Sequence, residues 1–457
     1  MIHNERISFL NEKPPCRGSY VLYWMQQSQR AEYNHALEYA VIRANELALP
    51  LLVFFGVTPS FPEANGRHYR FMLEGLRDTA SRLRGRGIAV TVQVCPPDRG
   101  AVKLARDAAL TVTDRGYLRI QRQWRAAAAR AMKCPLVQVE SDAIVPVESA
   151  SPKEEYTAGT FRPKIMAHLP FYLKPLRHGR PRVDPASIDH PSLDLDDIDA
   201  IIGKAGVDRS VAPVRWLRGG TGEAKRLLRR FIADRLDSVP AERNDPSKDC
   251  VSHLGPYLHF GQISPLYIAL EVLKTKSPGR DIFLEELIVR RELSFNFVFY
   301  NGMYDSIQCL PDWARKTLRN HAADRRDYRY DLAALEKADT HDRYWNAAQR
   351  ELLLRGKMHG YMRMYWGKKI LEWSASPEEA YAAALYLNNR YSLDGRDPNG
   401  FAGVAWCFGK HDRAWSERRI FGKIRYMNDR GLERKFDMDR YLALVDPASR
   451  AGGPVTP

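Results

Sequence analysis

Three tryptophans in the C-terminal third of the chain, Trp345, Trp366 and Trp373, have the residue type and spacing for single-electron chemistry. Trp366 and Trp373 are seven residues apart, so on one helix they share a face and lie about 10.5 Å apart along its axis. Indole is the side chain most easily oxidised to a radical cation, so a row of indoles can pass electrons stepwise. Tryptophans at this spacing are also ordinary core residues, and on the residues alone the core is favoured.

Two residues of opposite charge lie near these tryptophans in the sequence. Arg363 comes one helical turn before Trp366 in the helix-like run 355–373, and Asp394 opens DGRDPNG in the polar segment 387–406, which is expected to be a loop. Buried opposite charges must pair. Arg363 and Asp394 are therefore expected to form an ion pair that ties the loop to the helix.

Residues 243–264, RNDPSKDCVSHLGPYLHFGQIS, bring turn-forming side chains and Lys248 to the segment before a helix expected near Pro265. Backbone amides, hydroxyls and a lysine in such a loop suit a pyrophosphate. A loop that only caps the helix is the alternative, and these residues by themselves favour it.

The amino-acid sequences of these segments resemble those of the class II cyclobutane pyrimidine dimer photolyases, flavoproteins that repair ultraviolet-damaged DNA with light. The resemblance is carried by GKMHGYMRMYW, KKILEW, LDGRDPNG, GKIRYM, RNDPSK…PYLHFGQIS and YWM…QR, and it extends over most of the chain. It implies non-covalent FAD, active as FADH⁻, that gives one electron to a pyrimidine dimer in DNA when excited by light. Family members can also hold an antenna chromophore in the N-terminal domain, and the sequence does not identify one.

The same resemblance implies a set of flavin contacts. Arg363 and Asp394 match the pair over the isoalloxazine ring near N5, where fixed charges would stabilise a reduced flavin. Asn388 matches the group beside N5, since a carboxamide can donate or accept as N5 gains or loses a proton. Gly255 stands where the family usually has serine, Val239 stands where a tyrosine is common, and Asn399 is expected to be a turn residue. The residues expected to bind FAD are Arg243, Asn244, Val251, Ser252, His253, Leu254, Gly255, Gln262, Arg363, Asn388, Asp394 and Asp397.

The tryptophans match the family's electron relay. The resemblance places Trp366 nearest the flavin, Trp345 in the middle and Trp373 outermost. Trp313 and Trp415 lie outside the matched relay, and we expect both in the core.

A dimer inside a duplex cannot reach a cofactor, so it must be flipped out into a pocket. The residues that the resemblance places in this pocket are Glu286, Tyr361, Met364 and Trp406, and those expected to contact DNA are Arg290, Lys410 and Arg413. Glu286 belongs to the run EELIVRREL. A carboxyl group desolvated by apolar neighbours favours its neutral form, which could donate a hydrogen bond to a thymine carbonyl. A glutamate on an exposed helix is the alternative.

The bulk composition is that of a globular protein with a basic surface. The 457 residues are 44% hydrophobic, carry a formal net charge of +15 and contain six cysteines without a CxxC pair. The charge favours a polyanionic partner, and the cysteine and histidine spacings support neither a disulfide framework nor a metal site. No apolar run is long enough for a membrane span. The default expectation is a soluble, monomeric, cytoplasmic protein, associated with the nucleoid if bacterial or archaeal.

Periodicity predicts two domains. Strand-length apolar runs at 19–25, 51–57, 88–94, 110–113 and 137–140 alternate with amphipathic helical runs such as 30–47 and 68–86, which is typical of a doubly wound parallel sheet. The pattern beyond residue 222 is almost wholly helical. We expect an α/β domain at 1–180, a linker rich in Pro and Asp at 181–221 and an all-α FAD-binding domain at 222–457.

Two rival functions remain at this point. A flavin photoreceptor of the cryptochrome kind would share the fold, the FAD and the tryptophans, but it would lack a lesion pocket. A nucleic-acid-binding protein without catalysis would account for the charge alone. The presence of bound flavin would exclude the second rival.

Overall fold

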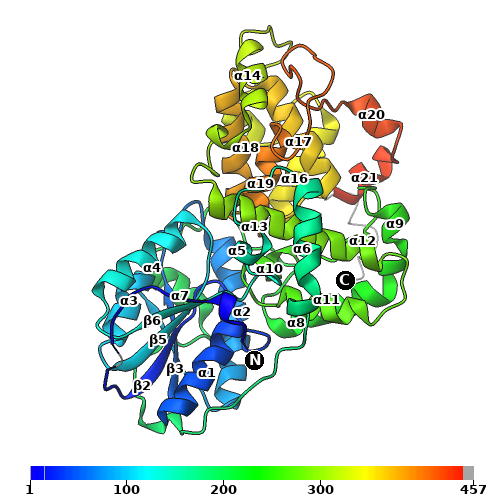
Figure 1. Cartoon of the computed structure of the whole chain (residues 1–457). Helices are drawn as coiled ribbons and strands as arrows, with labels where there is room; N and C mark the ends of the chain where they lie inside the picture. Colours follow the sequence, from blue (N-terminus) through cyan, green and yellow to red (C-terminus); the bar gives the residue numbers. More distant parts are fainter. Residues whose placement is uncertain (1, 15, 446–457) are drawn as a thin grey trace.

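The computed structural model describes residues 2–14 and 16–445 (Figure 1). An α/β part forms one end of the molecule, in blue and cyan, and helices coloured from green to red form the other end. The predicted order of an α/β domain followed by an all-α domain is therefore confirmed.

The α/β part is built on a six-stranded sheet. The five strands expected from the sequence run parallel, and they are β2 (Tyr20–Trp24), β3 (Leu51–Val57), β4 (Ala89–Val94), β5 (Ala108–Asp114) and β6 (Leu136–Val139). The spatial order is β1-β6-β5-β2-β3-β4. The sequence pattern missed β1 (Ile7–Phe9), which pairs antiparallel with β6. Three residues are too few to show the alternation that marks a strand.

Helices cover both faces of this sheet, as a doubly wound fold requires. Successive residues of a strand point to opposite faces, and β2 shows the consequence. Val21 and Tyr23 pack in a core with α1 (His35–Leu47) and α2 (Gly66–Gly85), whereas Leu22 and Trp24 pack in a second core with α3 (Pro97–Leu104) and α4 (Arg119–Ala131). Because both faces are buried, the strands are continuous apolar runs.

The segment expected to be a linker contains a helix, α7 (Ile198–Ala205), that packs on the sheet. Its residues Ile198, Ile201 and Ile202 are buried in the same core as α1 and α2. Eight residues after a run rich in Asp and Pro are too short to stand out as a helix in the sequence. In contrast, α6 (Ala158–Tyr172) packs in a core with helices from beyond residue 222. The domain boundaries at 180 and 222 stay a prediction.

The remainder of the described chain is helical apart from its connections. It begins with the short helix α5 (Val147–Ala150). The later helices are α8 (Thr221–Asp234), α9 (Val239–Glu242), α10 (Gly255–His259), α11 (Pro265–Leu273), α12 (Arg280–Leu284), η4 (Glu285–Arg290), α13 (Arg291–Tyr300), α14 (Asp312–Asn320), α15 (Leu332–Glu336), α16 (Arg343–Arg355), α17 (Gly360–Trp373), α18 (Pro377–Tyr391), α19 (Pro398–Cys407), α20 (Asp429–Glu433) and α21 (Met438–Val445).

Two local expectations are wrong. The run 355–373 is not one helix, because α16 ends at Arg355, Gly356 takes the left-handed conformation at φ 66°, and His359 caps α17. The segment 387–406 is not a loop throughout, because α18 extends to Tyr391 and α19 begins at Pro398. Proline at the first helical position after a capping aspartate is a standard helix start, which the polar composition of the segment obscured.

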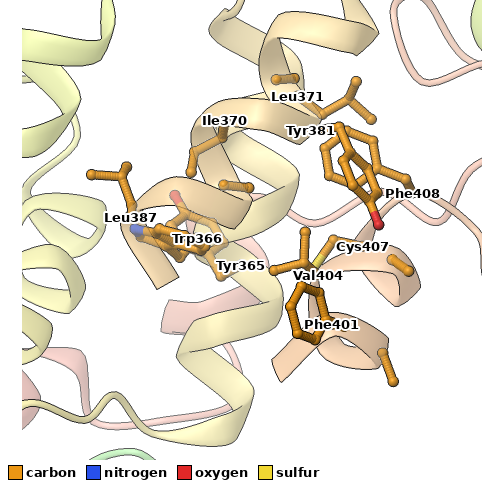
Figure 2. Packing of buried hydrophobic residues seen from close by; sticks show 14 of the residues in the cluster. Tyr365, Trp366, Ile370, Leu371, Tyr381, Leu387, Phe401, Val404, Cys407 and Phe408 are labelled. Carbon is orange, nitrogen blue, oxygen red and sulfur yellow. The ribbon is translucent and has the colours of Figure 1, made fainter. Parts of the chain in front are cut away.

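A tight core joins the last three long helices. Figure 2 shows Trp366, Ile370 and Leu371 of α17 packed with Tyr381 and Leu387 of α18, and with side chains of α19. A Cβ atom on Gly367 would lie 2.5 Å from Sγ of Cys407. Glycine is therefore required where α17 and α19 approach most closely.

Arg30, the last residue of the motif YWMQQSQR, fixes the sheet to the helical part. Its Nη1 donates to Oδ1 of Asp142 at 2.6 Å and to the carbonyl of Gly261 at 2.9 Å, and both charged side chains are at most 2% exposed. One guanidinium group therefore contacts both parts of the molecule.

Replacing Arg30 should destabilise the fold strongly. Arg30→Ala leaves Asp142 buried without its charge partner, which typically costs about 3–5 kcal/mol of unfolding free energy. The matched control is Arg43→Ala, which breaks an exposed ion pair with Glu46 on α1 and should cost less than about 1 kcal/mol. Urea denaturation followed by circular dichroism measures both variants. Equal losses would contradict the role given to Arg30.

Candidate functional site

A cleft in the helical part brings together residues that are far apart in the sequence. It encloses about 770 Å³ of empty space, part of it open to solvent. Seven of the residues expected at the flavin or lesion site line it: Ser252, Leu254, Gly255, Glu286, Arg363, Asp394 and Asp397. The residues of this cleft that the sequence did not single out as ligands are Leu258, Phe283, Leu287, Arg291, Asn399 and Gly400. We call it the flavin cleft below, after the cofactor that the resemblance implies.

One wall of the flavin cleft consists of the α10 segment and the loop before α19 in close contact. A Cβ atom on Gly255 would lie 2.4 Å from Oδ2 of Asp394. The serine that the family usually has at position 255 would collide with this carboxylate as it is placed here. Glycine at position 255 thus leaves the space that the carboxylate of Asp394 occupies. Oδ1 of Asp394 also accepts a hydrogen bond of 2.6 Å from Ser392.

The predicted pair of Arg363 and Asp394 is present, with Nη2 and Oδ1 separated by 3.9 Å. Nη1 of Arg363 donates to Oδ1 of Asn388 at 3.1 Å. Asn388 is 2% exposed and does not line the cleft itself. It acts on the cleft through the guanidinium group of Arg363, which it helps to orient.

Asp397 holds the loop before α19. Its Oδ1 accepts hydrogen bonds of 2.8 Å from the backbone and the side chain of Asn399, and its Oδ2 lies 3.2 Å from Nδ1 of His259. Burial raises the pKa of Asp397, but the hydrogen bond and charge of His259 outweigh it and hold the pKa below its usual value. Asn399 is therefore more than a turn residue, since it both anchors Asp397 and lines the cleft.

Glu286 reaches the cleft from an irregular turn. Residues Glu285–Arg290 form a π-helical turn between α12 and α13, and such turns occur frequently at functional sites. The Glu286 side chain is 52% exposed, and its Oε1 accepts a hydrogen bond of 2.7 Å from Arg243. The expectation of a desolvated carboxyl group is therefore wrong for the protein without DNA. Arg243 lies at the rim and holds this carboxylate.

The imidazole of His253, which is expected at FAD, is held by two neighbouring side chains. Its Nε2 lies 2.8 Å from Oδ1 of Asp249 and its Nδ1 lies 2.9 Å from Nζ of Lys357, so both ring nitrogens are used. Burial and the nearby Lys357 lower the pKa of His253 to about 4. Its backbone has φ 56°, and only this backbone remains available to a ligand.

Three other residues expected at FAD lie away from the cleft. Gln262 is fully buried, and its side chain accepts from the backbone of Gly220 and donates to the carbonyl of Phe71. Asn244 is exposed in the turn after α9. The carbonyl of Val251 accepts from Arg235 at 3.3 Å. Gln262 is thus a structural residue, and its amide was mistaken for a ligand because it lies in the PYLHFGQIS motif.

The three tryptophans of the expected relay form a buried row, with Trp345 between Trp366 and Trp373. The rings of Trp366 and Trp345 are stacked, with centroids 6.5 Å apart and planes inclined by 5°. Trp345 and Trp373 meet edge to face at 5.6 Å. All three are at most 2% exposed. Nε1 of Trp345 donates to the carbonyl of Trp366, and Nε1 of Trp366 donates to Gln349, which fixes both rings.

Trp373 is the outermost of the three tryptophans, yet it does not reach the surface. Tyr330 and His341 contact it edge to face, with centroids 5.4 and 5.3 Å away. The hydroxyl of Tyr330 lies 2.7 Å from Nδ1 of His341. Tyr328, which is 50% exposed, stacks on His341 at 3.7 Å. Two tyrosines therefore lie between the tryptophan row and solvent.

The other residues expected around the lesion do not line the flavin cleft. Trp406 is half-buried, with the cations of Lys368 and Arg425 over its ring at 5.0 and 5.2 Å. Met364 is half-buried on α17. Tyr361 lines a separate cleft with residues 426–435.

Two assignments near the C-terminus are wrong. Lys410 is only 8% exposed, and its Nζ binds Glu154 and the carbonyl of Cys309, so it cannot contact DNA. Trp415 is 38% exposed and is not a core residue. The guanidinium groups of Arg413 and Arg425 lie 5.0 and 4.4 Å from its ring. The alternation of Arg and Trp at 413–415 could have indicated this surface.

The remaining assignments fit a surface or a core role. Arg290 is 53% exposed and approaches Glu285 at 3.5 Å, and Arg413 is exposed. Trp313 packs against the core, with its Nε1 donating to the hydroxyl of Tyr156 at 2.8 Å.

A second cavity lies at the carboxyl ends of the sheet strands, where doubly wound folds bind ligands. It encloses about 740 Å³ of empty space and is lined by Gln26, Gln27 and Gln29 of the N-terminal motif, and by His259 and Arg396 of the helical part. The Nε2 of Gln26 and the Oε1 of Gln29 are buried without a hydrogen-bond partner among the described residues. A donor and an acceptor thus remain available to a ligand.

Within residues 2–14 and 16–445, no three His, Cys, Asp or Glu side chains are arranged to hold a metal ion. No helix in that part of the chain has the length and apolarity to cross a membrane.

Solved structures share this architecture. A class III photolyase from Agrobacterium tumefaciens aligns with a TM-score of 0.69 and 18% identity over 94% of this chain and 87% of that one. A photolyase from Sulfolobus tokodaii, described with two FAD molecules, aligns with a TM-score of 0.72 and 14% identity over 93% and 90%. At these identities the likeness establishes the fold, an α/β domain joined to a helical domain.

Sequence comparison identifies the family. Residues 21–182 match the family model described as DNA photolyase. The chain is 57% identical to the deoxyribodipyrimidine photo-lyase of Methanothermobacter thermautotrophicus over 97% of this chain and 98% of that protein, and 43% identical to that of Potorous tridactylus over 93% and 81%. The chain therefore belongs to the photolyase/cryptochrome family. The relatives named deoxyribodipyrimidine photo-lyase confirm the prediction that it is an enzyme.

Acid should destabilise the protein through its buried histidines. His359 is 6% exposed, and burial together with Lys357 lowers its pKa to about 4, whereas an unfolded histidine titrates near pH 6.5. Between these values only the unfolded chain binds the proton. The free energy of unfolding should therefore fall as pH is lowered from about 6.5 to 4, by up to about 1.4 kcal/mol per pH unit for each such group.

The variant His359→Asn tests this directly. Nδ1 of His359 accepts from the backbone of Tyr361 at 3.2 Å, and asparagine can accept the same hydrogen bond at a helix start without titrating. Urea denaturation at several pH values should show a slope reduced by about one proton, with His253 still contributing. An unchanged slope would show that His359 does not titrate between the two states.

Proposed function

We propose that this protein is a class II photolyase that splits cyclobutane pyrimidine dimers in DNA with light. The observation that carries the proposal is the geometry of α17. Arg363 of this helix lines the flavin cleft, and Trp366, one turn further, begins the buried row of tryptophans. An electron carrier next to a ligand cleft is what a light-driven flavoenzyme requires.

FAD fits the flavin cleft by its chemistry. Arg291 and Arg363 supply two guanidinium groups, Ser252 supplies a hydroxyl, and Phe283 and Leu287 supply apolar surface. The close contact of Gly255 with Asp394 leaves no Cβ in the wall. Reduced FAD, when bound, supplies one electron on absorbing light and takes it back after the dimer has split.

The side chains of this chain would prepare the cleft for that exchange. Asn388 orients Arg363 at 3.1 Å, and the pair of Arg363 with Asp394 places a positive and a negative group at the cleft wall. Fixed charges aimed at the place where charge develops stabilise it without reorganisation. Asp397, held charged by His259, fixes the loop that carries Asp394.

Loss of dimers under blue light tests the proposal. Purified protein with bound flavin in reduced form should restore pyrimidines in DNA that contains cyclobutane dimers, and it should not do so in the dark. Protein that binds flavin and dimer-containing DNA but splits no dimer under illumination would contradict the proposal and favour a photoreceptor.

The Trp366→Phe variant should keep its flavin but lose photoreduction. Phenylalanine is too hard to oxidise to carry a hole between the cleft and Trp345. The variant with chemically reduced flavin should still repair DNA, since the relay only refills the flavin. Absorption spectra during illumination with a thiol measure the rate. Trp313→Phe is the matched control, because Trp313 lies outside the row. Photoreduction of Trp366→Phe at the wild-type rate would remove the relay assignment.

Glu286 should act on the dimer itself. It lines the flavin cleft and is held by Arg243, so a bound dimer can displace Arg243 and accept a hydrogen bond from a protonated Glu286. That bond would favour the reduced dimer, in which negative charge develops on a thymine oxygen, over the ground state.

The variants Glu286→Ala and Glu286→Gln test this role. Removing such a donor is typically worth about 2–4 kcal/mol at a barrier. The repair yield per photon should fall by a smaller factor than this free energy implies. The yield depends on how fast the dimer splits relative to the return of the electron, and not on the splitting rate alone. Glu286→Gln keeps a donor and should lose less. Glu285→Ala, a neighbour that pairs with Arg162, is the control and should have the wild-type yield. Equal yields for wild type and Glu286→Ala at saturating DNA would show that Glu286 is a surface residue without a role at the dimer.

The cavity at the sheet edge supports an antenna chromophore. The free donor of Gln26 and the free acceptor of Gln29 match a planar ligand with an acceptor and a donor along one edge, as flavins and deazaflavins have. The residue types do not choose between these chromophores. Damaged DNA as partner and a cytoplasmic, monomeric protein remain part of the proposal.

A further inference from the structure

A third cleft is lined by Tyr361 of α17, which projects about 160° away from Arg363 on this helix. It encloses about 660 Å³ of empty space, part of it open to solvent. It is formed by the first turn of α17, by residues 426–435 around α20, and by Arg418 of the preceding loop. Its main lining residues are Tyr361, Arg418, Tyr426, Asn428, Arg434 and Lys435. We call it the cationic cleft.

The cationic cleft carries positive charge without compensation. Arg418, Arg434 and Lys435 line it, and within residues 2–14 and 16–445 none of them has a carboxylate within ion-pair distance. The nearest acids in the sequence have other partners: Glu417 lies 2.9 Å from His321, and Glu433 accepts from the hydroxyl of Tyr344 at 2.7 Å.

Aromatic rings hold two of these cations at the cleft. Nζ of Lys435 donates to the hydroxyl of Tyr361 at 3.0 Å and lies 5.5 Å from its ring centre. The guanidinium group of Arg418 lies 5.1 Å from the ring centre of Tyr426. Such contacts orient a cation without neutralising it. The cleft is therefore prepared for an anion.

The position of this cleft relates it to the flavin cleft. Tyr361 and Arg363 are two residues apart on α17, and they face the cationic cleft and the flavin cleft respectively. The arginine before Tyr426, Arg425, contacts both Trp406 and the exposed Trp415. Arg413 also contacts Trp415, so cations and exposed aromatic rings continue from the cationic cleft along this segment.

We propose that the cationic cleft binds a backbone phosphate of the DNA. This inference rests on the proposed function and extends it to a site that contacts no base. Its three cations can each approach a phosphate oxygen, while the cleft contains no enclosing wall that would select a small free anion. It should therefore raise affinity for damaged and undamaged duplex alike.

The test is DNA binding by Arg434→Ala and Arg418→Ala, in the full-length protein with bound flavin. Fluorescence anisotropy with a labelled duplex, with and without a thymine dimer, gives the Kd at several salt concentrations. Each variant should weaken binding about threefold to tenfold for both duplexes and lower the slope of log K against log salt by about 0.9. The matched control is Arg440→Ala, an exposed arginine of α21 that does not line the cleft, and its Kd should change less than twofold.

Three outcomes would overturn the proposal. The first is wild-type Kd and salt slope in both cleft variants. The second is an equal loss in Arg440→Ala, which would make the effect one of net charge. The third is calorimetry in which inorganic phosphate binds the wild type tightly and Arg434→Ala abolishes this without affecting DNA binding, because the occupant would then be a free anion.

The repair assay separates this proposal from the proposed function. If dimers are split under light while the cleft variants bind DNA normally, only the cationic cleft proposal fails. If the cleft variants lose affinity for both duplexes while the wild type splits no dimers, only the repair function fails.

Discussion

The hydrogen bond between His259 and Asp397 is the contact on which the arrangement of both cavities depends. Asp397 uses one carboxylate oxygen to start α19 through Asn399 and the other to accept from His259. His259 lines the cavity at the sheet edge, whereas Asp397 lines the flavin cleft. A single buried pair therefore forms part of the wall between the two cavities. Because this pair keeps Asp397 charged, the helix start and the wall are stabilised by the same group.

Close backbone contacts extend this coupling to the N-terminal motif. The side chain of Gln27 donates to the carbonyl of His259, and a Cβ atom on Gly261 would lie 2.0 Å from the carbonyl oxygen of Gln27. Gly261 has φ 64°, a conformation that other residues adopt at a cost. Together with Arg30, these contacts make the motif a joint between the sheet and the helical part as well as a cavity wall. The contacts of Gln27 with the helical part thus account for this residue without a ligand in the cavity.

The sequence predicted what depends on local pattern. Strands buried on both faces were found because they are continuous apolar runs. Helices buried on one face were found because their apolar residues recur with the helical period. The pair of Arg363 with Asp394 and the order of the tryptophans were predicted from the resemblance of their sequence motifs to a known family. Lys410 and Gln262 were misassigned because their partners, Glu154 and Gly220, are remote in the sequence.

Some of the site could not be found from local pattern at all. The π-helical turn at Glu285–Arg290 shifts the helix face, so that Glu286 and Leu287 line the cleft together with Arg291 of the next helix. A regular 3.6-residue period predicts a different set of neighbours. The boundary between α18 and α19 was hidden in the same way, because capping by Asp397 outweighs the polar composition around it.

The geometry of α17 explains how one helix serves two incompatible environments. Electron transfer requires a rigid, dry row of rings, and DNA binding requires exposed cations in water. At about 100° per residue, Arg363 and Trp366 project only about 60° apart, whereas Tyr361 projects about 160° away from Arg363. One face of the helix therefore meets the flavin cleft and the buried indoles, which are at most 2% exposed. The opposite face of its first turn meets the exposed Lys435. Because the separation arises from the helical repeat itself, the spacing from Tyr361 to Trp366 cannot change by one residue without exposing the row or burying the cations.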